Sequence, residues 1–194
     1  MFQVQYPNFK TNGNYMFTYR EAITTATHLL KELEGTCVRA QIVGSLRRLR
    51  PEVNDIDIIT IPEFSFEETA TLFGDTVEQN LLDLRLAGLC NGDQYMMQSN
   101  GPKIKRLLIK TSGTLVPVDI YIASESTWWT LLLIRTGSRN HNIALARRAL
   151  EKHMVLKADG TGLLTAGGDI IPISSEEDIF RHLNLSFCSP EERG

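Results

Sequence analysis

The chain has 194 residues, of which 42% are hydrophobic and 22% are charged, a balance that predicts an ordinary globular domain with a substantial core. Its net charge of −3 gives no overall sign of a nucleic-acid partner, and its three separated cysteines argue against a disulfide framework. We expect a cytoplasmic protein, because the N-terminus lacks a signal-peptide pattern and the longest apolar run, 128–134, is too short to cross a membrane.

The first predicted helix follows Thr18. Thr18 and Glu21 have the spacing of a capping box, apolar residues follow at helical intervals, and Gly35 ends the helix. Further along, "CVRAQIV" predicts a strand, "GSLRRL" a turn with a short helix, and "DIDIITI" another strand. The segment "TVEQNLLDLRLAG" predicts a helix at 76–88, and "IKRLLIK" and "LVPVDIYIA" predict two more strands.

The second half of the chain is mainly helical. "SESTWWTLLLIR" predicts a helix that breaks at "TGS", and Ser138 can cap the next helix, "RNHNIALARRALEKH". A hairpin is expected around Asp159 and Gly160, and Ser174 with Glu177 predicts a capped last helix. We therefore expect two lobes, a sheet lobe at 1–125 and a smaller helical lobe at 126–194.

Two aspartates stand at the head of an apolar strand. Asp55 and Asp57 are two residues apart, so both side chains project from one face of the strand. Because like charges repel and an unpaired buried carboxylate is costly, a cation or the nearby arginines must lie between them. Asp119 is a third carboxylate on a strand of otherwise apolar residues. Three converging carboxylates suit hard divalent cations, and a pair of such ions serves phosphoryl or nucleotidyl transfer.

A Gly-Ser turn precedes these aspartates. Gly44 and Ser45 lie where a strand runs into a helix N-terminus, which offers backbone N–H groups and a hydroxyl to an anion. Arg48, one helical turn later, can approach the same anion with its forked guanidinium. The sequence therefore predicts a polyphosphate beside metal-bound carboxylates.

Charge is also unevenly distributed along the chain. Segment 63–93 carries seven carboxylates and a single arginine. The basic residues gather elsewhere, in three clusters: Arg47, Arg48 and Arg50; Lys103, Lys105, Arg106 and Lys110; Arg135, Arg139, Arg147, Arg148 and Lys152. Charge clusters are usually solvated faces, but these three are also compatible with one positive groove.

The motif "GSLRR" followed by Asp55 and Asp57 resembles the nucleotidyltransferase superfamily of DNA polymerase beta. The C-terminal part, from "RTGSRNHNIALARRALEKH" to "PISSEEDIFRHLNLSFCSPEERG", resembles the thumb of family X DNA polymerases. The resemblance extends from about residue 36 to the end of the chain. It implies an α+β fold, with a nucleotidyltransferase palm of mixed sheet and flanking helices and a small helical and hairpin thumb.

The resemblance also implies roles for individual residues. Asp55 and Asp57 correspond to carboxylates that bridge two Mg²⁺ ions, for which Mn²⁺ is a possible substitute, and Asp119 to the ligand of the catalytic ion alone. The nucleotide-binding candidates are Gly44, Ser45, Arg48, Ile134, Arg135, Gly137, Ser138 and Asn142. The DNA-binding candidates are Lys103, Lys105, Arg106, Arg139 and Arg147.

The chain departs from the family pattern at several positions. Ile134-Arg135 replaces an aromatic pair, and Pro117 and Tyr121 stand where relatives carry arginines. Nothing before residue 18 resembles a lyase domain or helix-hairpin-helix segments, so we expect a palm and thumb only, as in the smallest viral members of the family. A virus or phage source would suit such a chain.

The leading hypothesis is a monomeric DNA polymerase that binds a dNTP and a primer–template or gapped DNA, and the family resemblance implies short-gap repair as its role. One alternative is a nucleotidyltransferase that acts on a small molecule or a protein, and another is a template-independent terminal transferase. A catalytically inactive DNA-binding scaffold is disfavoured, because all three aspartates are present. None of the four histidines has ligand spacing, and Trp128 and Trp129 are expected in the core.

Overall fold

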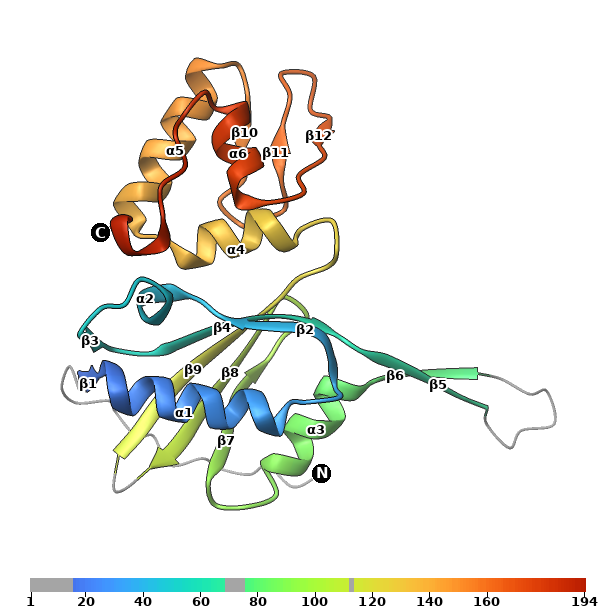
Figure 1. Cartoon of the computed structure of the whole chain (residues 1–194). Helices are drawn as coiled ribbons and strands as arrows, with labels where there is room; N and C mark the ends of the chain where they lie inside the picture. The colour runs from blue at the N-terminus through green and yellow to red at the C-terminus, as the bar shows by residue number, and fades with distance from the viewer. Residues whose placement is uncertain (1–15, 69–75, 112–113) are drawn as a thin grey trace.

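The structure is a computed structural model that describes residues 16–68, 76–111 and 114–194. Within these ranges the chain forms two lobes, one stacked on the other (Figure 1). The first lobe contains a five-stranded sheet and flanking helices, and the second contains helices and a small three-stranded sheet. The predicted α+β fold is therefore confirmed.

The main sheet is mixed, with the strand order β2-β4-β9-β8-β7. Its strands are β2 (Cys37–Ile42), β4 (Ile56–Pro62), β7 (Tyr95–Asn100), β8 (Ile104–Thr111) and β9 (Thr114–Ile122). Strands β4 and β9 are parallel, and the other neighbouring strands are antiparallel. The first residue of β4, Ile56, pairs with Val118 in the interior of β9.

One face of the sheet is covered by α1 (Tyr19–Glu32) and α3 (Leu81–Leu89) (Figure 1). Helix α1 begins with the predicted capping box, in which Thr18 N donates to Glu21 Oε2 at 2.9 Å and Glu21 N donates to Thr18 Oγ1 at 3.3 Å. Its apolar stripe packs on alternate residues of the strands, because these project to one face. The buried residues of this first core include Ala22, Ala26, Leu29, Ile56, Ile58, Leu82, Leu86, Leu107, Val118 and Ile120.

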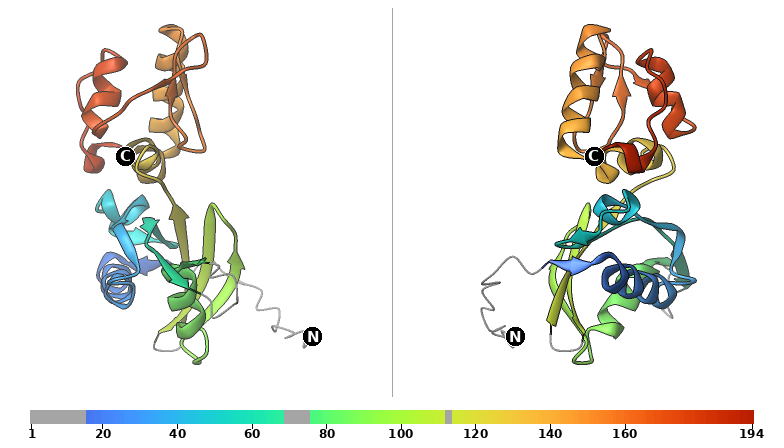
Figure 2. Two further views of the ribbon diagram at one scale, coloured as in Figure 1. Left: turned by 90° about the vertical axis from the view of Figure 1, so that its right-hand side faces the viewer. Right: turned by 60° about the vertical axis from the view of Figure 1, so that its left-hand side comes forward.

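The opposite face is partly covered by α4 (Trp128–Thr136). Trp128 is fully buried against Ile59 and Ile61 of β4, which confirms its predicted place in the core. Leu133 and Ile134 of the same helix belong to the core of the second lobe. Helix α4 therefore connects the two lobes, and the second lobe lies above this face of the sheet (Figure 2).

The second lobe is built on two longer helices, a short 3-10 helix and three two-residue strands. These are α5 (Arg139–Glu151), β10 (Val155–Leu156), β11 (Leu163–Leu164), β12 (Ile170–Ile171), α6 (Glu176–His182) and η1 (Pro190–Glu192). Ser138 caps α5 as predicted, accepting a hydrogen bond from His141 N at 3.3 Å. The predicted hairpin is the antiparallel pair β10–β11. We propose a domain boundary near residue 125, since β9 ends at Ile122 and α4 begins at Trp128.

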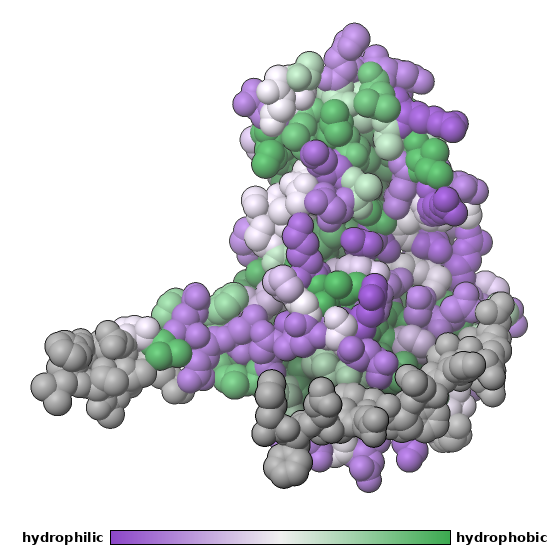
Figure 3. Space-filling model, turned by 180° about the vertical axis from the view of Figure 1, so that it is seen from behind, coloured by the Kyte–Doolittle hydropathy of each residue, from purple (hydrophilic) through white to green (hydrophobic). Residues whose placement is uncertain are grey.

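The predicted helix at 76–88 is wrong in its first part. Residues Thr76–Asn80 form strand β6, which pairs with β5 (Phe64–Glu68) in an antiparallel ribbon, and the helix begins only at Leu81. Asn80 stops the strand because its side chain caps α3, accepting from Asp83 N at 3.2 Å. The ribbon projects from the body of the molecule (Figures 1 and 3).

The predicted cap of the last helix is also wrong, by one residue. Ser175, not Ser174, is the N-cap of α6 and accepts from Asp178 N at 3.2 Å. Ser174 instead donates its hydroxyl to the Asp178 carboxylate. The remaining short elements are β1 (Phe17–Thr18), α2 (Gly44–Arg47) and β3 (Glu52–Val53). No helix in the described part of the chain is long and apolar enough to cross a membrane.

Candidate active site

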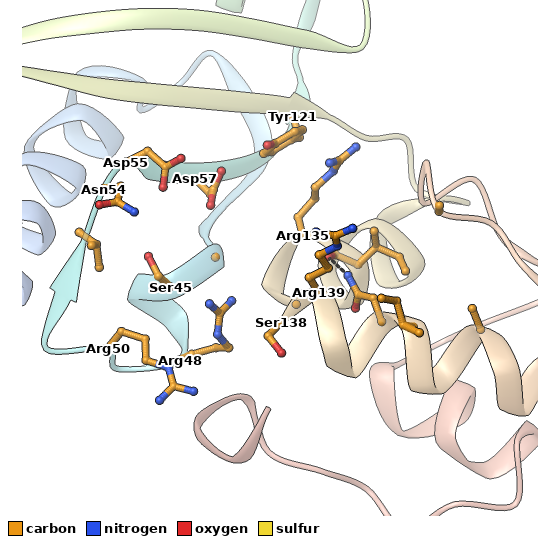
Figure 4. A pocket seen from close by; sticks show the side chains of 18 of the residues that line it. Ser45, Arg48, Arg50, Asn54, Asp55, Asp57, Tyr121, Arg135, Ser138 and Arg139 are labelled. Atoms are coloured by element: carbon orange, nitrogen blue, oxygen red, sulfur yellow. Dashed lines mark hydrogen bonds between the residues drawn. The ribbon is translucent and has the colours of Figure 1, made fainter. Parts of the chain in front are cut away.

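A cavity of about 780 Å³ opens between the two lobes. Its first wall comes from α2, β3, β4 and the loops between them, and its second wall from α4 and α5, as Figure 4 shows. The polar lining residues are Ser45, Arg48, Arg50, Glu52, Asn54, Asp55, Asp57, Tyr121, Arg135, Ser138, Arg139 and Asn142. All eight predicted nucleotide-binding residues line this one cavity.

The predicted catalytic aspartates lie on the sheet face below the second lobe. Asp57 of β4 and Asp119 of β9 are register partners on the two parallel strands. Their alternate neighbours Ile56, Ile58, Val118 and Ile120 are buried in the first core, so the aspartates must point to the opposite face. Asp55 and Asp57 both line the cavity, and their carboxylates are directed toward Ser45 (Figure 4).

The electrostatics of this group match the expected repulsion. Burial, followed by the negative charges of Asp55 and Asp119, raises the pKa of Asp57 to about 7. Burial, followed by the charge of Asp119, raises the pKa of Asp55. Two carboxyl groups are therefore held in a site that disfavours their ionised form, which is the condition that a bound cation relieves.

Asp119 lies beside the cavity rather than among its lining residues. The Tyr121 hydroxyl donates to Asp119 Oδ2 at 3.3 Å, and Arg106 Nε lies 3.3 Å from Oδ1. Both oxygens of Asp119 thus have partners. Within the described ranges, no three His, Cys, Asp or Glu side chains are arranged to hold a metal ion as they stand.

Gly44 allows α2 to approach the strand that carries Asp57. Gly44 has φ +64°, a conformation that residues with a side chain rarely adopt. A Cβ atom at this position would lie 2.1 Å from Asp57 Oδ2. Both the backbone conformation and the lack of space therefore require glycine here, and the turn brings Ser45 to the carboxylates.

Arg48 joins the first wall of the cavity to the second. Its Nη1 donates to the carbonyl oxygen of Thr136, the last residue of α4. Gly137 has φ +68°, and a Cβ there would lie 3.2 Å from Arg48 Nη1. Glycine thus permits the close approach of the guanidinium to the "TGS" segment. Burial, followed by the positive charge of Arg50, lowers the pKa of Arg48.

The pair that replaces the family's aromatic residues also lies at the cavity. Ile134 is mostly buried in the core of the second lobe, and its carbonyl accepts a hydrogen bond from Asn142 Nδ2 at 2.8 Å. Arg135 points toward Tyr121 (Figure 4), with its Cζ atom 4.1 Å from the centre of the ring. This distance is within the range of a cation–π interaction. Two of the chain's departures from the family pattern, Arg135 and Tyr121, therefore contact each other.

The predicted DNA-binding residues fall into three groups. Lys103, Arg139 and Arg147 are exposed, as a DNA contact requires. Arg106 is exposed too, but it is placed at Asp119. The prediction for Lys105 is wrong: its side chain is only 4% exposed, and Nζ lies 2.5 Å from Asp83 Oδ1 and 2.6 Å from Asn100 Oδ1. The face of β8 that carries Lys105 also carries buried Leu107 and Ile109, so the ammonium needs an internal partner.

Some residues of the site were missed at the level of sequence. Arg50 and Asn54 line the cavity although neither was proposed to bind nucleotide, and Arg139 lines it although it was assigned to DNA. The sequence shows Tyr121 only as a residue in the place of an arginine. In the structure its hydroxyl donates a hydrogen bond to Asp119. For Arg50 a signal existed, since it is two residues from Arg48 in the same basic cluster.

Residues 131–194 match the family model described as DNA polymerase beta thumb. The chain is 27% identical over 173 residues to a DNA polymerase/3′-5′ exonuclease PolX of Bacillus subtilis (strain 168), covering 89% of this chain and 26% of the relative. It is also 27% identical over 165 residues to DNA polymerase lambda of Rattus norvegicus, covering 77% of this chain and 28% of the relative. The chain thus spans about a quarter of the length of these relatives.

A solved structure shows the same fold. The polymerase beta of Leishmania infantum, in a ternary P/T complex, superimposes with a TM-score of 0.74 and 19% sequence identity, covering 93% of this chain and 77% of that one. The thumb match begins inside α4 and includes the whole second lobe that follows it. In its thumb, in its two sequence relatives and in its fold, the chain is therefore similar to the family X DNA polymerases.

Proposed function

We propose that this chain is a DNA polymerase, which adds dNMP from a dNTP to a primer 3′-hydroxyl in short-gap repair synthesis. One observation carries the proposal: a single cavity between the lobes combines Asp55 and Asp57 with Ser45 and Arg48 of the first lobe and with the Gly137 segment of the second. Carboxylates suit metal ions, and the Ser-Arg pair suits a triphosphate. The family relationship agrees with this chemistry.

The residues present fit two Mg²⁺ ions, with Mn²⁺ as a substitute. Asp55, Asp57 and Asp119 would hold them, and the raised pKa values of Asp55 and Asp57 support this, because burial and like charge disfavour the ionised carboxylates there. When bound, such ions activate the attacking oxygen and neutralise charge on the reacting phosphate. Arg106, an exposed arginine on the same sheet face, lies 3.3 Å from Asp119 Oδ1.

Different residues of the cavity would bind different parts of the nucleotide. Ser45 and Arg48 bind the triphosphate, and the guanidinium of Arg48 offers charge-assisted hydrogen bonds to phosphate oxygens. Gly137 lines the cavity, and its lack of a side chain would let a sugar approach the backbone closely. The nucleotide is then held between the lobes, with its α-phosphate on the side of the carboxylates. Positioning of this kind supplies much of the rate enhancement in phosphoryl transfer.

DNA would lie along the exposed basic residues. Arg139 lines the cavity and Lys103 and Arg147 are exposed, and phosphate neutralisation dominates non-specific affinity for DNA. The solved relative from Leishmania infantum was captured in a ternary P/T complex. We propose that this chain binds primer–template or gapped DNA as a monomer.

Primer extension tests the proposal and its alternatives together. The purified chain is incubated with Mg²⁺ and single dNTPs on three labelled substrates: a recessed primer–template, a one-nucleotide gap and an unpaired primer. We expect addition of the templated nucleotide to the first two, and none by the variant Asp57→Asn. The exposed Asp93→Asn is the matched control and should behave as wild type.

Other outcomes would replace the proposal. Addition of any dNTP to the unpaired primer would identify a terminal transferase. Failure to extend any primer by a chain that melts cooperatively would exclude a polymerase. A nucleotidyltransferase acting on a small molecule or a protein would then be the better explanation of the cavity.

A further inference from the structure

A buried acid in the second lobe binds two arginines at once. Glu176, at the start of α6, accepts from Arg47 Nη1 at 3.0 Å through Oε1 and from Arg47 Nη2 at 2.5 Å through Oε2. Arg193 Nη1 donates to the same Oε1 at 2.7 Å. Arg47 belongs to α2 of the first lobe, whereas Glu176 and Arg193 belong to the second. This Arg47–Glu176–Arg193 network therefore crosses from one lobe to the other.

The network is hidden from solvent. The side chains of Arg193, Glu176 and Arg47 are 0%, 5% and 18% exposed. Burial alone would raise the pKa of Glu176, but the hydrogen bonds and charges of Arg47 and Arg193 hold it below its ordinary value. Buried charges are costly unless they are paired, so each member of the network depends on the others.

Both arginines also hold the wall of the nucleotide cavity. Arg47 Nη1 donates to Thr136 Oγ1 at 2.7 Å, and the neighbouring Arg48 donates to the carbonyl of the same Thr136. The carbonyl of Arg193 accepts from the backbone N–H of Ser138 at 3.1 Å. The "TGS" segment is thus bound at each end, at Thr136 by Arg47 and at Ser138 by Arg193.

We propose that Glu176 is a positioning residue for the nucleotide cavity, which through Arg47 and Arg193 holds the "TGS" segment against Arg48. Glu176 does not line the cavity and acts only through its two partners. Without its carboxylate, two guanidinium groups face each other unneutralised across the junction of the lobes. The walls then separate, and Arg48 and Gly137 no longer present one surface to a nucleotide. This inference rests on the proposed function only where nucleotide kinetics are used to test it.

The chain offers a matched control one residue away. Glu177 is exposed and lies in the same first turn of α6, so Glu177→Gln removes the same charge without touching the network. The test compares Glu176→Gln with Glu177→Gln and wild type. For each protein, the KM for a dNTP and kcat are measured on saturating primer–template. Hydrogen exchange of peptides that contain Ser138 is measured on the same proteins without DNA.

We expect Glu176→Gln to raise the KM for the dNTP about tenfold or more with a much smaller change in kcat, since a misplaced wall weakens positioning. The Ser138 amide should lose protection, because its acceptor, the Arg193 carbonyl, is released. Glu177→Gln should match wild type in both measurements. In the double variant Arg47→Gln with Glu176→Gln, the KM for the dNTP should rise no further than in the more affected single variant. Both substitutions break the same contact between the lobes, so their effects should not add.

A purely structural role predicts a different result. If Glu176→Gln lowers Tm but leaves the KM and the Ser138 protection at the values of Glu177→Gln, the proposal is overturned. If Glu176→Gln does not fold, Arg47→Gln, which changes the least buried member of the network, is compared in the same way. If wild type extends no primer, the proposed polymerase function fails. Hydrogen exchange at Ser138 in Glu176→Gln and Glu177→Gln then still decides whether Glu176 holds the "TGS" segment in place.

Discussion

Asp57 and Asp119 stand at the same register position of neighbouring parallel strands, β4 and β9. Their backbone partners are fixed by the sheet, so the distance between the two carboxylates is set by a rigid element rather than by a loop. The structure accommodates the repulsion in two ways: Asp57 is held with a raised pKa, and Asp119 is turned to Arg106 and Tyr121. This relationship leads to the first two predictions.

Asp119→Ala should abolish primer extension without destabilising the fold. Removing this carboxylate takes away a proposed metal ligand, and metal contributions to catalysis amount to several kcal/mol. The exposed ion pair with Arg106 is lost, but repulsion with Asp55 and Asp57 is relieved. Activity and thermal melting are measured on the same samples, with exposed Asp93→Ala as the control. A folded variant that retains more than about a tenth of the wild-type activity would remove Asp119 from this role.

Asp57 should make the metal-free protein less stable as pH rises. Its pKa is about 7 in the folded chain against an ordinary value of 3.8. Between these values the folded state binds more protons than the unfolded state, so the free energy of unfolding falls as pH increases through this window. Below this pH window Asp57 is protonated in both the folded and the unfolded state, and it no longer destabilises the fold.

The measurement is Tm of wild type and Asp57→Asn between pH 4 and pH 8 in a chelator. A pKa unit is worth about 1.4 kcal/mol, and 1 kcal/mol is about 2–4 °C for a chain of this size. We expect the variant to melt several degrees higher at pH 8 and equally near pH 4. Mg²⁺ should raise the Tm of wild type more than that of the variant at pH 8. A Tm difference that does not change with pH would contradict the raised pKa.

Gly44→Ala should be far more damaging than a comparable change elsewhere. The new Cβ would lie 2.1 Å from Asp57 Oδ2, and the alanine would also have to adopt a positive φ. Gly35→Ala is a precise control, because Gly35 has φ +75° but nothing within 4 Å of its added Cβ. The control measures backbone strain alone, roughly 1–2 kcal/mol.

Gly44→Ala should add to that strain the displacement of Asp57, and activity should be lost while Gly35→Ala remains active. Urea unfolding and primer extension of both variants provide the comparison. Equal losses of stability with full activity in both would show that Gly44 does not set the position of Asp57.

Much of the site was predictable because its signals are local. A capping box at Thr18 and Glu21 and two aspartates at a spacing of two are determined by residues that are neighbours in the sequence. The pairing of Asp57 with Asp119 joins strands far apart in the chain. The three strand aspartates suggested that their carboxylates converge, but the register of the two strands was not predicted, since local patterns do not specify register.

The failures have physical causes too. Thr76–Asn80 begins with two β-branched residues, which favour a strand, and it pairs with Phe64–Glu68, so the helical pattern that begins at Leu81 does not extend back into it. At α6 two serines each precede a carboxylate by three residues, and only the structure distinguishes Ser175 from Ser174. Lys105 had a usable signal, because it alternates with Leu107 and Ile109 on the buried face of β8.

DNA binding should depend steeply on salt. Each phosphate that is neutralised contributes about −0.9 to the slope of log K against log salt, so roughly four contacts give a slope near −3.6. Arg147→Glu or Lys103→Glu should reduce the magnitude of this slope without changing sequence preference, because both residues are exposed. Lys105→Glu is not a test of this kind, since it would break the ion pair of a buried lysine with Asp83.

The matched control is Arg20→Glu, which reverses the charge of an exposed arginine in the first turn of α1. Affinity for primer–template is measured by fluorescence anisotropy over a range of salt concentrations. An affinity of wild type that does not vary with salt would exclude the basic groove. A change of slope in Arg20→Glu as large as in Arg147→Glu would show that the position of the charge is unimportant.

Discrimination against ribonucleotides should persist but be incomplete. The backbone of Ile134 is tied to Asn142 by a hydrogen bond of 2.8 Å, so the wall beside Gly137 is held in place without the aromatic pair of relatives. Arg135, however, lies over Tyr121 and adds a donor beside the cavity. A site that must reject a single added hydroxyl by shape typically achieves only about 10²-fold selectivity.

Replacing Arg135 with phenylalanine should therefore increase selectivity for dNTPs, and Ile134→Tyr with Arg135→Phe should increase it further. Ile134 is packed in the core of the second lobe, so tyrosine there can cost roughly 1–3 kcal/mol of stability, and Tm has to be measured alongside. The test compares kcat/KM for a dNTP and the matching rNTP in wild type, Arg135→Phe and the double variant, with Arg20→Phe as a surface control. Wild-type rejection of ribonucleotides beyond about 10⁴-fold, the level expected of a purpose-built contact, would show that Ile134-Arg135 already forms a complete sugar gate.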